Sequence, residues 1–172
     1  MVVAFVGRLI PEKGINSIIE AARAKDITKR DICFVLAGDG PLANEVKEAC
    51  SSDLFWLGRC NTEDISSLLQ QADVLCLPTR SEGFSTVLLE ASACGTPAVV
   101  TDVGGARELI PDDSYGTIIQ SMSSDEVVLA LCRLFDDRRL LSLQSRNSRA
   151  LVENRYSWDA TAIDVEKAFC IR

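Results

Sequence analysis

Short apolar runs alternate along the chain with segments in which apolar residues recur every three or four positions. The runs predict buried strands at residues 2–6, 32–37, 54–57, 74–77, 98–100 and 116–119. The segments between them predict helices at residues 15–24, 41–49, 62–71 and 86–94, with Pro41 at a first helical position and Asn61 as a cap. Continuous apolar strands separated by amphipathic helices are typical of a doubly wound parallel α/β sheet, which helices cover on both faces.

The last third of the chain has a different pattern. From Ser124 onward it is helical and charged, over residues 125–135, 138–153 and 158–171. We expect a helical tail packed on or beside the sheet, with Trp158 as the anchor of its last helix. The aromatic residues of the first three strand regions are expected in the core: Phe5, Phe34, Phe55 and Trp56.

The Gly-rich and charged segments of the chain follow four of the predicted strands. They cover residues 7–14, 38–40, 58–61 and 78–84. In doubly wound sheets, ligands bind beyond the carboxyl ends of the strands. We therefore expect a ligand site where these loops meet.

The first of these loops reads GRLIPEKG and begins at Gly7. Its two cations, Arg8 and Lys13, can face a common anion, because Arg offers a planar fork of donors and Lys a compact point charge. Such a pair suits the neutralisation of a departing diphosphate. The alternative is that both side chains are solvated loop charges.

The segment SEGFSTVLLE contains two carboxylates on either side of a predicted helix start. Ser85 or Thr86 can cap this helix, whose first backbone N–H groups and positive dipole end favour an anion. Gly83 lets a ligand approach the backbone closely, and Phe84 lies beside it. The spacing predicts a site for a nucleotide-bound sugar.

Glu82 and Glu90 are expected to play different roles in this segment. The predicted helix places Glu90 away from Glu82, and no companion feature indicates a glycosidase cleft, so two acceptors for sugar hydroxyls fit better than an acid-base pair. The alternatives are a helix-surface charge for Glu90 and a solvated loop residue for Glu82.

Two further Gly-containing segments carry weaker signals. The sequence GDGP at residues 38–41 is most simply a turn into a helix, and it matches neither GxGxxG nor a P-loop. The sequence VGGARELI at residues 103–110 fits an anion-binding helix start and a structural Gly-Gly turn equally well.

Composition narrows the classes of function. A formal charge of −7 and a pI of about 4.7 argue against a nucleic-acid surface. No apolar run approaches the ~20 residues of a membrane span, and the start of the chain lacks the pattern of a signal peptide. At 172 residues with 47% hydrophobic content, the chain fits one domain, residues 1–172.

Residue types also limit the chemistry. The chain has no His, which removes Ser-His-Asp triads, Cys-His pairs and imidazole acid-base catalysis. Its seven Cys are irregularly spaced without a CxxC pair, so we expect no metal site and a reducing, cytoplasmic setting. Cys33 and Cys76, which lie in strand-like runs, are expected to act as small buried hydrophobes.

Several motifs occur in an order that resembles a known family. They are GRLIPEKG, AGDGP, LGRC, the block ADVLCLPTRSEGFSTVLLEASACGTPAVVTDVGGARELI, and YSWD. Together they resemble the carboxyl-terminal, donor-binding domain of the retaining GT-B glycosyltransferases of group 1, or glycosyltransferase family 4. The most specific element is the Glu-x7-Glu pattern, which Glu82 and Glu90 meet. The resemblance implies a Rossmann-like domain, the carboxyl-terminal half of a GT-B fold.

The resemblance also implies roles for the site residues. Arg8 and Lys13 would hold the diphosphate of a nucleotide-sugar donor, a UDP- or GDP-sugar, and stabilise it as leaving group. Glu82 would contact the transferred sugar and Glu90 the ribose. The backbone of Gly83, Phe84, Ser85 and Thr86 would contact phosphate, with Gly7 beside it. Arg59 and Cys60 would border the base. Family members act without a metal, and a front-face route in which the donor phosphate accepts the acceptor's proton fits a chain without His.

The amino-terminal, acceptor-binding domain of the family is expected to be a further part of the same polypeptide. By this resemblance the chain is the donor-binding half of a hexosyltransferase-type enzyme, inactive in isolation. We expect the full-length protein to be cytoplasmic and peripheral to the inner face of the membrane, and to serve a membrane-proximal acceptor in polysaccharide or glycolipid assembly. The alternatives are a non-catalytic nucleotide-sugar binding module and a sugar-nucleotide epimerase, which the lack of His disfavours.

Overall fold

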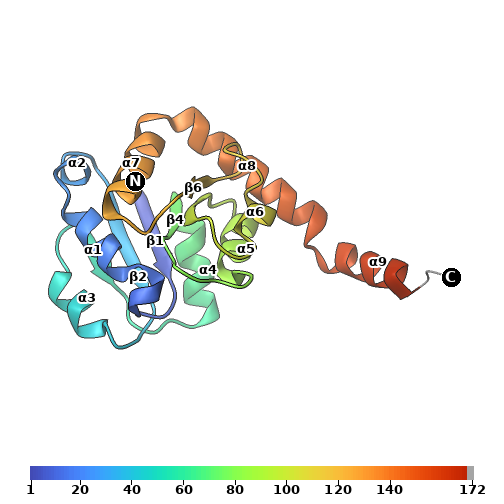
Figure 1. The fold of residues 1–172 in the computed structure, drawn as a ribbon, viewed down its shortest axis with the longest axis horizontal. Helices are drawn as coiled ribbons and strands as arrows, with labels where there is room; N and C mark the ends of the chain where they lie inside the picture. Colours follow the sequence, from blue (N-terminus) through green and yellow to red (C-terminus); the bar gives the residue numbers. More distant parts are fainter. Residues whose placement is uncertain (170–172) are drawn as a thin grey trace.

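The computed structural model describes residues 1–169 and contains a six-stranded parallel sheet in the order β3-β2-β1-β4-β5-β6 (Figure 1). Its strands are β1 (Val2–Val6), β2 (Cys33–Ala37), β3 (Leu54–Trp56), β4 (Val74–Leu77), β5 (Ala98–Thr101) and β6 (Thr117–Ile119). All six lie within a residue of the predicted runs. The strand order reverses between β1 and β4, and at such a switch point the loops diverge and leave a crevice for a ligand.

Two groups of helices cover the sheet (Figure 1). In one group α1 (Ile15–Arg23) packs against α2 (Lys25–Thr28), α3 (Ala43–Ala49) and α7 (Ser124–Asp136). In the other, α5 (Thr86–Cys94) packs against α4 (Thr62–Gln71), α6 (Ala106–Leu109) and α8 (Arg138–Arg155). The four-residue helix α2 and the 3₁₀ turn η1 (Pro11–Lys13) were not predicted, because one turn is too short to show a periodic pattern. Helix α6 corresponds to the helix start that was one of the two interpretations of residues 103–110.

The core confirms most of the buried positions predicted from the strands. Every residue of β4 and β5 is buried, as a sheet covered on both faces requires, and Phe5 and Phe34 are each 1% exposed. The prediction for Phe55 was wrong, since its side chain is 47% exposed. Side chains alternate along edge strand β3, so burial of Leu54 turns Phe55 to the other face.

Two predicted helix starts had different outcomes. Asn61 caps α4 through a reciprocal capping box with Asp64, as predicted. Helix α3, however, begins at Ala43 rather than at Pro41. The N–H of Leu42 donates to the carbonyl of Leu9 at 3.0 Å, which ties the segment before α3 to the loop after β1.

The carboxyl-terminal part packs on the body only as far as α8. Helix α9 (Trp158–Phe169) has no buried residue and extends away from the sheet in Figure 1. Trp158 is 88% exposed, so the prediction that it anchors this helix was wrong. Tyr156 supplies the aromatic contact instead, with its ring centroid 5.9 Å from that of Phe84. The predicted end of this helix, residues 170–171, lies outside the described residues, as does Cys170.

The six cysteines within residues 1–169 are free thiols. Burial raises the pKa of the Cys76 thiol to about 12, as expected of a small core residue. Cys33 is only half-buried, so the prediction that it is a buried residue was wrong. Among the helices of residues 1–169, none combines the length and the apolar character needed to cross a membrane.

Candidate functional site

The loops after β1 and β4 meet at the switch point of the sheet. There the ammonium group of Lys13 donates to the carboxylate of Glu82, and both side chains are about three-quarters buried. The two residues are 69 positions apart in sequence, so the fold alone joins them. The structure thus brings together a cation and a carboxylate that the sequence placed on separate loops.

Backbone contacts hold these two loops together. The carbonyl of Glu12 accepts from the N–H of Arg80 at 2.8 Å and from the hydroxyl of Thr79 at 3.0 Å. Gly14 has a left-handed backbone (φ +73°), and a Cβ there would lie 2.2 Å from the carbonyl oxygen of Pro78. No side chain fits at Gly14, so the approach of the two loops depends on this glycine.

The loop after β5 supports the other side of the β4 loop. The N–H of Gly105 donates to the carbonyl of Gly83 at 2.8 Å. Gly104 has φ +54°, and a Cβ there would lie 2.2 Å from the carbonyl oxygens of both Glu82 and Gly83. In VGGARELI the structure shows a tight Gly-Gly turn, which supports the segment that carries Glu82, and also a helix start at Ala106. Anion binding at this helix start stays a prediction.

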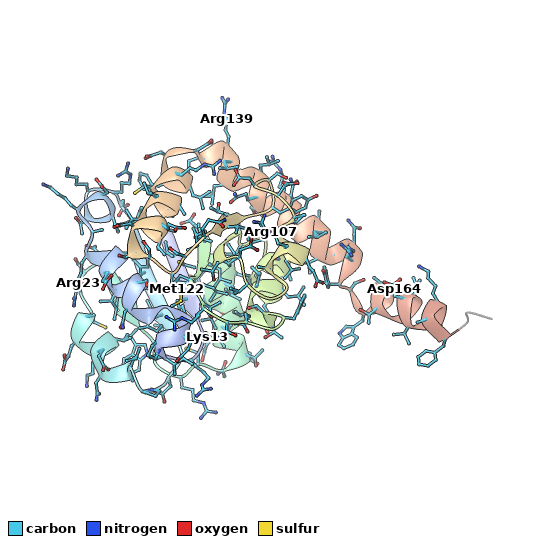
Figure 2. All side chains as sticks on the ribbon, in the orientation of Figure 1. Lys13, Arg23, Arg107, Met122, Arg139 and Asp164 are labelled. Atoms are coloured by element: carbon cyan, nitrogen blue, oxygen red, sulfur yellow. The ribbon has the colours of Figure 1, made fainter. Side chains whose placement is uncertain are left out.

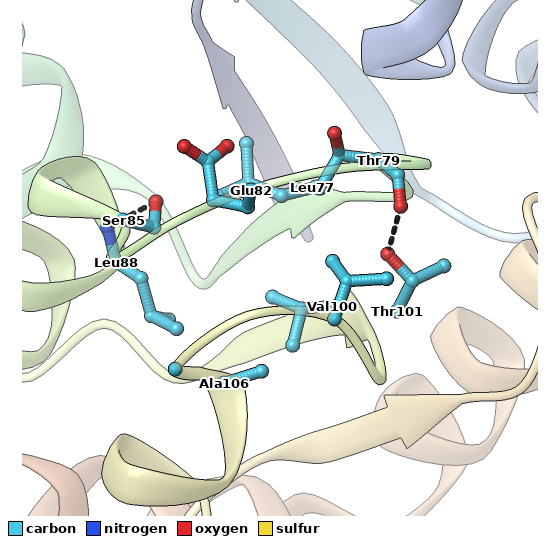
Figure 3. A pocket seen from close by; sticks show the side chains of 10 residues that line it. Leu77, Thr79, Glu82, Ser85, Leu88, Val100, Thr101 and Ala106 are labelled. Carbon is cyan, nitrogen blue, oxygen red and sulfur yellow. Dashed lines mark hydrogen bonds between the residues drawn. The ribbon is translucent and has the colours of Figure 1, made fainter.

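Helix α5 begins as predicted. The hydroxyl of Ser85 accepts from the N–H of Leu88 at 3.4 Å, which identifies Ser85 as the N-cap (Figure 3). The N–H groups of Thr86 and Val87, in the first turn, have no partner within the helix. Together with the dipole they make this end of α5 favourable for an anion.

Two adjoining pockets form a groove along the carboxyl edge of β1, β2 and β4. The first encloses about 320 Å³ between the β1 loop and the start of α5. The second encloses about 400 Å³ at the ends of β1, β2 and β3. Val6, Gly7 and Ile65 line both pockets, so the groove is continuous.

Most predicted site residues line this groove. The first pocket is bordered by Gly7, Lys13, Glu82, Phe84, Ser85, Thr86 and Glu90, and the second by Gly7, Arg8, Arg59 and Cys60. Gly83 lines neither pocket, and the structure places it against the loop after β5 instead. Thr79 and Asp39, which lie in two of the predicted loops, and Ile65 of α4 also line the groove, although none of the three was predicted as a site residue.

A smaller cavity lies beneath the β4 loop, between β5, α5 and α6 (Figure 3). It measures about 20 Å³, which is room for about one water molecule. Thr79 and Thr101 are buried at its rim, and the hydroxyl of Thr101 donates to the carbonyl of Thr79. Its size makes it a support of the site rather than a place for a ligand.

The electrostatics at the edge of the groove are mixed. Burial, reinforced by the nearby Asp64 carboxylate, raises the pKa of the Cys60 thiol, so this side chain is neutral at physiological pH. On the loop after β5, hydrogen bonds from Arg107 lower the pKa of Asp102.

Within residues 1–169, no three His, Cys, Asp or Glu side chains lie close enough together to hold a metal ion.

Comparison with known protein families gives a match over most of the chain. The family model described as glycosyl transferases group 1 matches residues 1–155. A relative from Escherichia coli, UDP-Gal:alpha-D-GlcNAc-diphosphoundecaprenol alpha-1,3-galactosyltransferase, is 34% identical over 166 residues, which cover 91% of this chain and 42% of the relative. The chain spans less than half the length of the first curated relatives that it matches.

Solved structures match the fold. The C-terminal domain of a glycosyl transferase group 1 family protein from Francisella tularensis superposes with a TM-score of 0.81 at 26% identity, covering 91% of this chain and 86% of that domain. HepE from Anabaena, in complex with UDP and glucose, superposes with a TM-score of 0.83 at 23% identity, covering 99% of this chain and 48% of HepE. The predicted doubly wound α/β sheet is therefore confirmed as the fold of a C-terminal domain of this kind.

Proposed function

Because the chain belongs to the glycosyl transferases of group 1, we propose that it is the donor-binding domain of a retaining glycosyltransferase. The observation that carries this proposal is the Lys13–Glu82 ion pair, which lies at the switch point of the sheet beside the start of α5. A phosphate-binding cation and a sugar-binding carboxylate are then adjacent, as a nucleotide diphosphate sugar requires.

The diphosphate is proposed to lie between the β1 loop and the start of α5. Lys13 has three N–H donors and uses one on Glu82, which leaves two for phosphate oxygens. Arg8 adds a second cation at the same groove, and Thr86 begins the helix whose free N–H groups face it. Two cations and a helix dipole offset the charge of a leaving diphosphate in a chain that is acidic overall.

The nucleoside is proposed to extend from the first pocket into the second. Glu90 is exposed one turn into α5 and borders the first pocket, where it can accept from ribose hydroxyls. Arg59 and the neutral thiol of Cys60 border the second pocket, where the base would lie. The Escherichia coli relative is named for UDP-Gal, which supports a UDP-sugar, and another relative is named as GDP-mannose-dependent, which supports a GDP-sugar as the alternative.

Transfer is proposed to proceed with retention of configuration and without a metal. The bond between the anomeric carbon and the phosphate oxygen breaks, the acceptor oxygen bonds to the same face of that carbon, and the acceptor's proton passes to the departing phosphate. Arg8 and Lys13 would stabilise the negative charge that develops on that phosphate. Such a route uses no imidazole, in keeping with a chain without His.

The acceptor is proposed to bind to a further domain of the same polypeptide, because the chain matches less than half of its curated relatives. The 172-residue chain should then bind the donor but transfer sugar inefficiently, since it lacks the acceptor site and a closed cleft. Robust transfer by this chain to any acceptor would contradict the proposal. We also propose that the full-length protein is cytoplasmic and acts on a membrane-proximal acceptor in glycan or glycolipid assembly.

Calorimetric titration with UDP, GDP, ADP and their common sugar conjugates tests the donor site. We expect one nucleotide to bind, and Arg8→Ala and Glu90→Ala each to weaken it about tenfold, the loss of one charge-assisted hydrogen bond. Arg139→Ala is the matched control, because Arg139 points away from the body on the opposite side from Lys13 (Figure 2). Equal binding by all four proteins, or none by the folded wild type at millimolar ligand, would contradict the site.

A further inference from the structure

Thr79 lies at the groove where the loop after β4 meets the loop after β1 and the end of β5. It follows β4 directly after Pro78 and is 5% exposed. Its hydroxyl oxygen lies 3.0 Å from the carbonyl oxygen of Glu12 and 3.0 Å from that of Ser81. Its own carbonyl accepts from the buried hydroxyl of Thr101 on β5 (Figure 3).

The two carbonyls that share this hydroxyl belong to the residues just before the ion pair. Glu12 precedes Lys13, and Ser81 precedes Glu82. One buried hydroxyl therefore contacts the backbone next to Lys13 and the backbone next to Glu82. A hydroxyl has a single proton, so the two carbonyls share it, and removal of the hydroxyl takes this donor from both loops at once.

We propose that Thr79 is a positioning residue, which holds Lys13 and Glu82 in register through the carbonyls of Glu12 and Ser81. The hydrogen bond from Thr101 ties the backbone of Thr79 to β5, so the hydroxyl is anchored to the sheet as well as to the two loops. This inference rests on the proposed function, since the register of Lys13 and Glu82 matters for a donor whose phosphate and sugar they contact.

The experiment compares two substitutions at Thr79. Thr79→Val removes the hydroxyl at nearly constant shape, and Thr79→Ser keeps it. By calorimetry with the nucleotide that wild type binds, we expect Thr79→Val to lower the affinity about tenfold and Thr79→Ser to stay within about twofold. Equal loss in both variants would overturn the proposal, because the hydroxyl would then be irrelevant.

A matched control separates positioning from stability. Thr96 is also a buried threonine, 2% exposed, whose hydroxyl donates to the carbonyl of Leu69, but it precedes β5 at the opposite edge of the sheet. Thr96→Val should lower the melting temperature as Thr79→Val does, yet leave nucleotide affinity within about twofold. Equal losses of affinity in Thr79→Val and Thr96→Val would show a general effect of stability and overturn the proposal.

A second measurement requires no ligand. In thermal unfolding, Lys13→Ala and Glu82→Ala should be non-additive, because their side chains interact, and this coupling should vanish in the Thr79→Val background. Unchanged coupling would overturn the role of Thr79. If the wild type binds no nucleotide while the coupling still depends on Thr79, the proposed function fails and the positioning role stands.

Discussion

Lys13 and Glu82 form an ion pair across the loops after β1 and β4, although 69 residues separate them in sequence. The pair neutralises a carboxylate that would otherwise repel a diphosphate. It also leaves two of the three donors of Lys13 for phosphate oxygens. Substitution of Lys13 and substitution of Glu82 should therefore affect phosphate binding and sugar binding differently.

Removal of the Glu82 carboxylate should separate sugar binding from phosphate binding. We expect Glu82→Ala to leave the affinity for UDP unchanged or higher, because Lys13 is released, while the advantage of the UDP-sugar over UDP falls about tenfold. Lys13→Ala should weaken both ligands alike. Calorimetry measures the affinity of each variant for UDP and for the UDP-sugar. An equal loss of affinity for both ligands in Glu82→Ala would contradict a sugar contact.

The two glycines beside the Glu82 carbonyl should respond differently to Ala. Gly104→Ala combines a left-handed backbone with a Cβ 2.2 Å from two carbonyl oxygens, so we expect a loss of about 1–3 kcal/mol in the free energy of unfolding. At Gly83 a Cβ meets nothing within 4 Å, and Gly83→Ala should stay within about 0.5 kcal/mol. Denaturant unfolding measures both. Equal stability of the two variants would contradict the interlocked loops.

The aromatic contact of the carboxyl-terminal segment should depend on Tyr156 rather than on Trp158. Tyr156 is half-buried against Phe84, so Tyr156→Ala should cost about 1–2 kcal/mol. Trp158 is 88% exposed, so Trp158→Ala should lie within about 0.5 kcal/mol of the wild type. Chemical denaturation of the two variants compares them directly, and a larger loss for Trp158 would restore it as the anchor.

Much of the architecture was predictable because it is local. The strands are short, uniformly apolar runs, which period and length identify, and Ser85 and Asn61 cap their helices through contacts three residues away. The candidate groove followed from one rule, that loops at the carboxyl ends of parallel strands meet. Ten of the eleven predicted site residues line it, Gly83 being the exception.

The features that could not be predicted from the sequence depend on contacts between segments that are distant along the chain. Thr79 contacts Glu12, 67 residues away, and nothing in its neighbourhood in sequence distinguishes it from any buried threonine. Phe55 and Trp158 were placed wrongly for a related reason, since composition indicates that an aromatic residue prefers burial but not whether another element covers it. Sequence patterns therefore predict the helices and strands and the edge of the sheet where a ligand is expected. Tertiary contacts decide which side chains hold the loops at that edge in place.

The loop after β6 should be sensitive to pH through Glu126. Its carboxylate accepts from the N–H of Gln120 at 2.6 Å, from the N–H of Ser121 at 3.2 Å and from the hydroxyl of Ser121 at 2.7 Å. These bonds, that from the Ser121 hydroxyl first, lower the pKa of Glu126. The stabilisation is therefore complete above the pKa of the unfolded chain, about 4.3, and is lost as pH falls through the lower pKa of the folded state.

Thermal unfolding of Glu126→Gln between pH 3 and pH 7 tests this dependence. At pH 7 we expect the melting temperature to fall by about 2 °C relative to wild type, because the amide bonds the two N–H groups and the hydroxyl less strongly. As pH falls below about 4.3 and through the lower pKa of the folded state, the two curves should converge, since wild type then loses the same charge. Asp125→Asn is the control, because Asp125 is exposed in the same first turn of α7 and reports the helix dipole alone. A difference between Glu126→Gln and wild type that stays constant from pH 7 to pH 3 would show that the side chain acts through its shape, and the charge-dependent support of this loop would be wrong.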